Sequence, residues 1–117
     1  MKVALPRFGE SVAPCFEHTA TISIFEIEGG RVGDQTDFLL HSRDPFDRVR
    51  LLRDQEVDTL ICGGMQHRFQ DIIEGRGIRV ISWVSGDVDD LLARFLRGDL
   101  EPGSSGACDA RGRGKSD

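Results

Sequence analysis

Two side chains that could bind a soft metal lie close together near the N-terminus. Cys15 and His18 stand three residues apart in the segment "APCFEHT". A thiolate with an imidazole favours zinc, copper or iron–sulfur chemistry over magnesium or calcium, because those metals prefer sulfur and nitrogen ligands. The alternative is a loop cysteine packed beside Phe16 and a solvated histidine. Cys108, near the C-terminus, is a further thiol that could close over a bound cluster or be inert.

A second candidate site is the segment "DTLICGGMQH". In open α/β sheets, ligands lie beyond the carboxyl ends of strands, where the next helix presents free N–H groups. An anionic cluster would suit this position. Each residue also has an ordinary interpretation. Cys62 can be a buried thiol, Gly63 and Gly64 can form a tight turn, Met65 can be a packing residue and His67 can be an exposed histidine in the first helical turn. The residues concerned are Cys62, Gly63, Gly64, Met65 and His67.

Familiar catalytic motifs do not accompany these residues. No third glycine completes a dinucleotide fingerprint, no Lys-Ser/Thr pair makes a phosphate-binding loop, and no serine occupies a nucleophile elbow. Asp87, Asp89 and Asp90 suit the start of the last helix, where carboxylates cap N–H groups and favour the helix dipole. They do not resemble a two-metal nuclease centre, which needs carboxylates converging from strands.

Length and composition limit the class of protein. A chain of 117 residues predicts one domain. A net charge of −5 speaks against a general nucleic-acid binder. No apolar stretch is long enough to span a bilayer, and Pro6 and Arg7 interrupt the first apolar run too early for a signal peptide. An odd number of cysteines, three, does not suggest a disulfide framework. We therefore expect a cytoplasmic protein that binds neither nucleic acid nor membrane.

The elements that must position the candidate residues follow from apolar spacing and turn residues. In the first part of the chain we expect a strand at residues 2–6, ended by Pro6, and a loop at residues 7–20. A hairpin should occupy residues 21–40, with its turn at Gly29–Gly30, because glycine takes a positive φ without steric cost.

Strands and helices alternate in the second part. The first helix should begin at Pro45, with Ser42 or Asp44 as its N-cap. The alternation implies parallel strands with right-handed crossovers, so together with the hairpin it predicts a mixed sheet. We expect one domain at residues 1–100 and a flexible tail at residues 101–117, which lacks an apolar pattern. The elements after the hairpin are a helix at 42–56, a strand at 57–63, a helix at 65–77, a strand at 78–84 and a helix at 85–98.

Four segments carry a family resemblance. They are "MKVALP", "VAPCFEHTATISIFEIEGGRV", "EVDTLICGGM" and "GIRVISWVSGDVDDLLARFLRGDL". In their order and spacing the chain resembles the dinitrogenase iron–molybdenum cofactor biosynthesis family of small cofactor-binding or carrier domains. The resemblance spans Met1 to about Leu100, and the collinearity of the segments makes it specific.

The resemblance implies a three-layer α/β/α, ribonuclease-H-like fold around a mixed five-stranded sheet in strand order 3-2-1-4-5. It also implies a protein that is not an enzyme and that holds an iron–molybdenum cofactor, another metal–sulfur cluster or a precursor. On this hypothesis the metal ligands are drawn from Cys15, His18, Cys62, His67 and Cys108. Gly63, Gly64 and Met65 would adjoin the cofactor, and the glycines would present backbone N–H groups to it.

The first loop departs from the family pattern, which usually reads Val-Ser-x-His-Phe-Gly-Arg. Here the loop reads "VAPCFEH", so Cys15 takes the place of the histidine, Glu17 that of the glycine and His18 that of the arginine. A thiolate could replace the imidazole as a ligand. The alternative function is an adaptor or regulatory domain that has lost the cluster and binds a protein or small anion. A carrier would meet a cluster-assembly or acceptor protein, and a monomer and a weak dimer fit equally.

Overall fold

The structure, a computed structural model, describes residues 1–103. The predicted tail and Cys108 therefore lie outside the described residues, except for residues 101–103. The elements, in chain order, are β1 (Lys2–Phe8), β2 (Ser11–Val12), the 3₁₀ helix η1 (Phe16–His18), β3 (Thr21–Glu28), β4 (Arg31–Leu39), α1 (Pro45–Asp54), β5 (Thr59–Ile61), α2 (His67–Gly75), β6 (Arg79–Ile81) and α3 (Val88–Leu96).

One mixed sheet forms the centre of the domain. Its strands lie in the order β4-β3-β1-β5-β6, and the short strand β2 pairs with β1 outside this path. The pairs β1–β3 and β3–β4 are antiparallel, whereas β1–β5 and β5–β6 are parallel. The predicted α/β class and the mixed sheet are confirmed. The sheet has six strands rather than five, because β2 was not expected, and the ribonuclease-H-like assignment stays a prediction.

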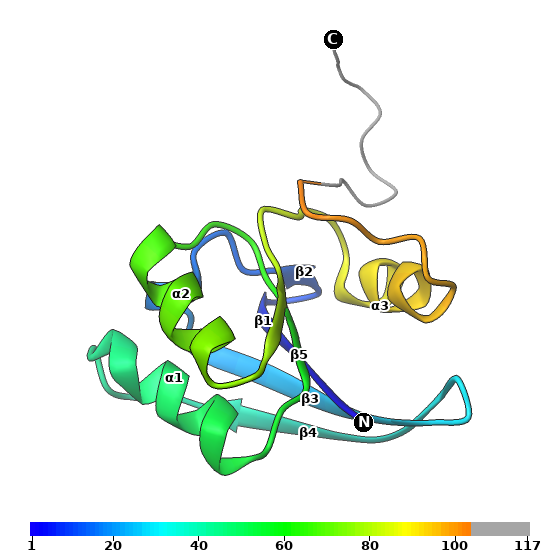
Figure 1. Ribbon diagram of the computed structural model, residues 1–117, viewed down its shortest axis with the longest axis horizontal. Coiled ribbons are helices and arrows are strands. Elements are labelled where there is room, and N and C mark those ends of the chain that lie inside the picture. Colours follow the sequence, from blue (N-terminus) through cyan, green and yellow to red (C-terminus); the bar gives the residue numbers. More distant parts are fainter. Residues whose placement is uncertain (104–117) are drawn as a thin grey trace, which may run out of the picture.

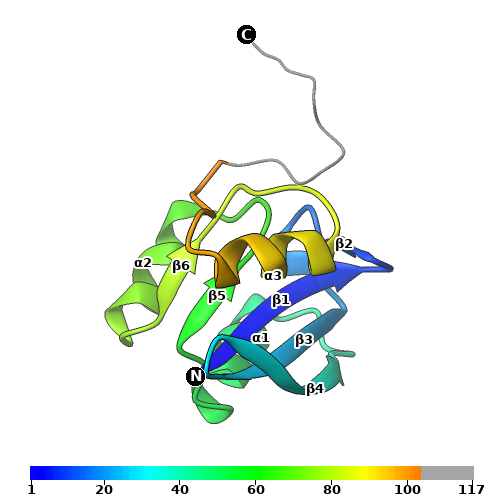
Figure 2. The same ribbon diagram turned by 90° about the vertical axis from the view of Figure 1, so that its right-hand side faces the viewer.

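Helices cover both faces of the sheet. Figure 1 shows α1 and α2 on one side of the strands and α3 on the other, and the view in Figure 2 agrees. Two separate groups of buried side chains fill the two interfaces. Beneath α1 and α2 the sheet contributes Ala4, Ile22, Ile24, Leu60 and Val80, and Cys62, which follows β5, joins them. Beneath α3 it contributes Val3, Leu5, Phe25, Ile27, Ile61 and Ile81. Successive residues of β1, β3, β5 and β6 thus face opposite layers.

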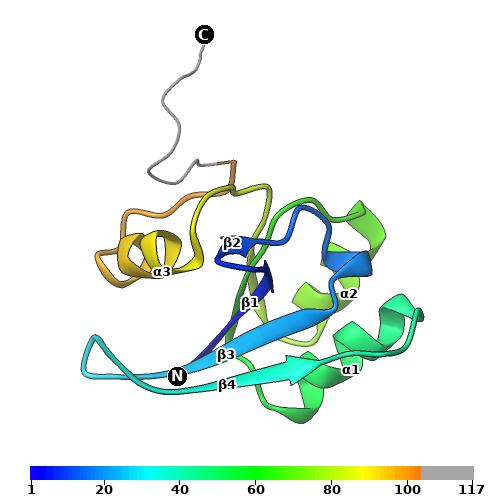
Figure 3. The same ribbon diagram turned by 180° about the vertical axis from the view of Figure 1, so that it is seen from behind.

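The hairpin forms where the glycine pair predicts it. Gly29 and Gly30 have φ angles of +60° and +75°, values that suit the primed turns of two-residue hairpins. Figure 3 shows the β3–β4 ribbon extending away from α1 and α2 to this turn, which lies on the side of α3. The Asp44–Pro45 signal is also confirmed, because the Asp44 carboxylate accepts the Phe46 N–H at 2.9 Å where α1 begins.

Two expectations about the first twenty residues were wrong, and a third, the cap of the last helix, was confirmed in position but not in its side-chain bond. Strand β1 continues through Pro6 to Phe8, because the Pro6 carbonyl still accepts the Ala13 N–H at 2.9 Å. The segment 7–20 contains β2 and η1 rather than being loop throughout. Asp87 is the N-cap residue of α3, but its side chain makes no capping bond, and the carbonyl of Glu10 accepts the Val88 N–H at 2.8 Å instead. Within residues 1–103, none of the helices has the length and apolar character needed to cross a membrane.

Candidate functional site

The first loop lies directly on the glycine turn after β5. The Phe16 N–H donates to the Gly64 carbonyl at 2.9 Å, and the Gly64 N–H donates to the Pro14 carbonyl at 2.8 Å. A Cβ atom on Gly63 would stand 2.4 Å from the carbonyl oxygen of Ala13. The space that these glycines leave open is therefore filled by the protein's own backbone. The two distant segments with candidate ligands do meet, but through main-chain contacts.

Trp83 also packs against the turn. A Cβ atom on Gly64 would lie 3.2 Å from a ring carbon of Trp83, and the Trp83 N–H donates to the Gly63 carbonyl at 2.9 Å. Trp83 has a φ of 62°, which is uncommon for a bulky side chain. The first loop and this indole ring thus both contact the turn.

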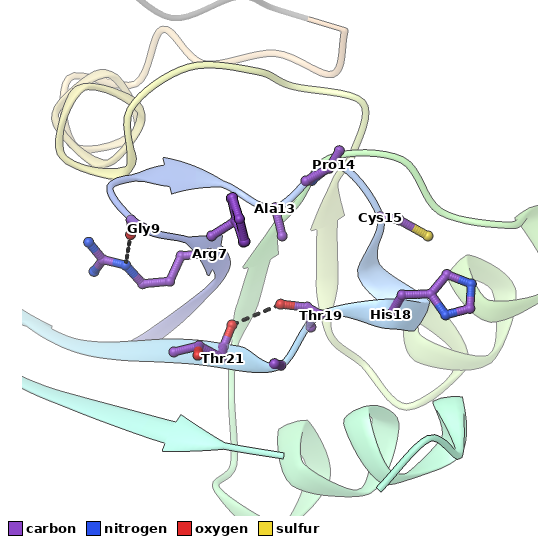
Figure 4. Close-up of a pocket in the computed structure, with 10 residues that line it drawn as sticks. Arg7, Gly9, Ala13, Pro14, Cys15, His18, Thr19 and Thr21 are labelled. Carbon is purple, nitrogen blue, oxygen red and sulfur yellow. Dashed lines mark hydrogen bonds between the residues drawn. The ribbon is translucent and has the colours of Figure 1, made fainter. Parts of the chain in front are cut away.

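Cys15 and His18 line one cavity of about 530 Å³. The cavity lies along residues 7–21, and Arg7 and Phe8 form its other end. Figure 4 shows the Cys15 thiol and the His18 imidazole projecting to the same side of the loop, and the Arg7 side chain extending the opposite way. Cys15 is partly buried and His18 is exposed, so both can reach a ligand from solvent.

The remaining candidate ligands do not join this cavity. Cys62 is completely buried and Met65 is 5% exposed, both within the apolar layer beneath α1 and α2. His67 does lie in the first turn of α2, but its side chain is 87% exposed and its Nε2 pairs with Asp71 at 3.6 Å. Among residues 1–103, no three His, Cys, Asp or Glu side chains come together as a metal-binding group. The described residues thus bring together Cys15 and His18, not the larger ligand set.

Sequence reasoning missed the role of Glu17. This carboxyl group is 5% exposed, which is unusual for glutamate. Its Oε2 accepts the Gln66 N–H at 3.1 Å, immediately before α2, and its Oε1 accepts the Cys15 thiol hydrogen at 3.9 Å. The only signal in the sequence is a glutamate where the resembling family has glycine. Glu17 therefore occupies the helix N-terminus where we expected an anionic ligand.

Arg48, on α1, holds the other end of the same segment. Its guanidinium is 3% exposed and donates to the Thr19 carbonyl through Nε at 3.0 Å and Nη2 at 2.8 Å. Its Nη1 donates to the carbonyls of Ser42 and Asp44 at 2.7 and 3.1 Å. Hydrogen bonds at Gly64, Gln66 and Thr19 thus fix the short segment that carries the thiol and the imidazole.

We expect Cys62 to resist alkylation in the folded protein. Burial, assisted by the negative charge of Glu17, raises the pKa of Cys62 from its ordinary 9.0 to about 12. At about pH 8, iodoacetamide should therefore modify Cys15 and leave Cys62 intact, because the thiolate is the reactive form. Residue-resolved mass spectrometry of a Cys108→Ser variant would measure this difference, and denaturant should make Cys62 reactive. Equal labelling of both thiols in the native state would contradict the buried position.

The same pKa shift makes a prediction about stability. The Cys62 thiol has a higher pKa in the folded protein than in the unfolded chain, so the folded state favours the protonated thiol. Its contribution to the free energy of unfolding is therefore fully present below about pH 9 and is lost as the pH rises toward 12. Chemical unfolding of the wild type and Cys62→Ala at several alkaline pH values should show a smaller pH-dependent loss in the variant. Parallel losses in both proteins would contradict the assignment to Cys62.

The fold and the site together define the class of protein. This is a small α/β domain with helices on both faces of a mixed sheet and with a thiol and an imidazole at one cavity beside a strand-to-helix turn. The chain belongs to the family described as dinitrogenase iron–molybdenum cofactor, whose model matches residues 1–98. It is therefore a small domain associated with that cofactor. No curated protein sequence is significantly similar to it.

Solved structures show the same fold at low sequence identity. PH0822 is 22% identical, with a TM-score of 0.81, and the match covers 87% of this chain and 94% of that one. MJ0327 of Methanocaldococcus jannaschii, described provisionally as a dinitrogenase, is 20% identical, with a TM-score of 0.73 and coverage of 86% and 92%. The apo form of the orange protein from Desulfovibrio gigas is 17% identical, with a TM-score of 0.70 and coverage of 86% and 91%.

Proposed function

We propose that the protein is a non-enzymatic carrier of a metal–sulfur cluster or its metal precursor, bound through Cys15 and His18. The observation that carries this proposal is that Cys15 and His18 are both lining residues of one open cavity in a domain of the cofactor family. Sulfur and nitrogen donors suit iron, zinc and copper. We leave Cys62, Met65 and His67 out of the proposed ligand set, because Cys62 and Met65 are buried and the exposed His67 pairs with Asp71.

The donor set fits a metal that is handed on. A closed structural metal site has four protein ligands, whereas an open site leaves positions for exchange. Cys15 and His18 supply two protein ligands, so the remaining coordination positions of the metal would be available to sulfide, water or an acceptor protein. The fixed main chain around Cys15 holds the thiol in place without requiring the metal. A carrier of this kind would receive its cargo from a cluster-assembly protein and deliver it to an acceptor.

Anaerobic reconstitution with iron, sulfide and molybdate tests the proposal. We expect wild type to bind iron and both Cys15→Ala and His18→Ala to lose most of it, as measured by elemental analysis per folded chain. His67→Ala is the matched control for His18→Ala, because His67 is an exposed histidine outside the cavity. The carrier proposal is wrong if wild type takes up no more metal than the Cys15→Ala/His18→Ala double variant.

An adaptor or regulatory domain without a cluster is the second candidate. It is favoured by the way the protein's own groups occupy the predicted cluster position: the first loop fills the glycine turn and Glu17 accepts the Gln66 N–H. On this function, uptake of metal should be at background level in wild type and in all variants. The reconstitution experiment therefore separates the two functions.

A further inference from the structure

A buried carboxylate lies beside the proposed ligand thiol. Glu17 contacts the Cys15 thiol on one side and the Gln66 N–H on the other, and it is almost fully enclosed. Within residues 1–103 it forms no ion pair. Its negative charge is therefore neither exposed to water nor matched by a directly bound cation. Such a charge acts strongly on neighbouring groups because the local dielectric constant is low.

The same carboxylate lines a second cavity, of about 430 Å³, whose other charged or titratable walls are basic. The cavity is bounded by Glu17, His18, Ser42, Arg43 and Arg48. The buried guanidinium of Arg48 donates only to backbone carbonyls, and it forms no ion pair in the part of the chain that the structure describes. Two arginines and a histidine among the lining residues would attract an anion. Glu17 is the acid among the lining residues that opposes this attraction.

We propose that Glu17 determines the charge of the cargo: it closes the Cys15–His18 site to anionic metal–sulfur species and leaves it open to metal cations. This inference rests on the proposed function and names the substrate class of the same site. An anion approaching Cys15 would meet a fixed negative charge and would find the Gln66 N–H already engaged. A divalent cation that bonds to the Cys15 sulfur displaces the thiol proton to solvent. The resulting thiolate and the Glu17 carboxylate together balance its two positive charges.

Two probes of opposite charge test the inference. Cadmium ion reports thiolate coordination by its ultraviolet absorption, and tetrathiomolybdate is an anion that carries its own sulfur. Both would be titrated anaerobically into wild type and Glu17→Gln at one ionic strength. Wild type should bind cadmium in preference to tetrathiomolybdate. Glu17→Gln should bind tetrathiomolybdate at least about tenfold more tightly and cadmium about tenfold more weakly than wild type, because one buried charge has been removed.

Matched controls keep the result specific. Glu28→Gln makes the same charge change at an exposed position next to the hairpin turn and should alter neither affinity. Glu17→Gly removes the side chain altogether and supplies a second variant if Glu17→Gln does not fold, as judged by circular dichroism.

The possible failures are distinguishable. If wild type binds metal species but a folded Glu17 variant binds tetrathiomolybdate no more tightly than wild type, this inference is overturned and the carrier function stands. If neither probe binds wild type or any variant, the carrier function itself fails, and this inference falls with it.

Discussion

Replacing Gly63 with alanine is expected to destabilise the fold by about 3 kcal/mol or more, because a methyl group would be forced into a packed backbone contact. The new Cβ atom would stand 2.4 Å from the Ala13 carbonyl oxygen and 3.2 Å from backbone atoms of Pro14. Neither neighbour is a flexible side chain that can turn aside, so the first loop must move off the turn. Urea unfolding followed by circular dichroism measures the loss, and iron uptake should fall with it because Cys15 belongs to that loop.

Gly75→Ala is the matched control. Gly75 ends α2, and a Cβ atom there would meet nothing within 4 Å. Alanine has a higher helix propensity than glycine, so this variant should be unchanged or more stable by about 0.5 kcal/mol. If Gly63→Ala and Gly75→Ala unfold at the same urea concentration, the close contact between the first loop and the turn does not exist as described.

Local sequence signals predicted the elements whose causes are local. The Gly29–Gly30 pair identified a turn that needs two positive φ angles, and Asp44 with Pro45 identified the start of α1. Apolar spacing likewise identified α2, α3 and the two parallel strands near their observed positions. In each case the residues that determine the conformation are neighbours in the sequence, so they can be recognised without knowledge of the fold.

The first loop could not be predicted in this way, because its structure comes from distant partners. Strand β2 pairs with β1, and the Val12 N–H donates to the Gly86 carbonyl at 2.9 Å. Phe16 is held by Gly64, which lies 48 residues further along the chain. Nothing in the spacing of residues 7–20 indicates these contacts. The candidate ligands were therefore found by residue type, but which of them share a cavity was decided by tertiary structure.

The burial of two charged side chains could not be predicted from the sequence either. Glutamate and arginine are normally exposed, so Glu17 and Arg48 gave no sign of burial. In the structure they fix the segment that carries Cys15 and His18, one through a helix N–H and the other through carbonyl groups. The geometry of the loop that carries Cys15 and His18 thus depends on two residues that are not proposed as metal ligands. Removing either should disturb the loop more than a surface substitution would.

Arg48→Met is accordingly expected to lower the free energy of unfolding by about 3 kcal/mol, because it leaves buried carbonyl groups without a donor. Methionine fills much of the space of the aliphatic stem but cannot bond to the carbonyls of Thr19 and Ser42. Lysine should rescue only part of the loss, since one ammonium group does not reproduce the planar guanidinium fork. The freed segment should also make Cys15 react faster with iodoacetamide at denaturant concentrations where the protein remains folded.

Arg53→Met, on the same helix, is the matched control for Arg48→Met. Arg53 is half exposed, and among residues 1–103 its side chain pairs with the neighbouring Asp54 alone, at 3.1 Å, so its loss should change stability by no more than about 0.5 kcal/mol. Urea unfolding would give the stabilities, and the alkylation rate of Cys15 would report the loop separately. If Arg48→Met were as stable as Arg53→Met and its Cys15 reacted at the wild-type rate, the guanidinium would not be what holds the loop, and the position of the thiol would need another cause.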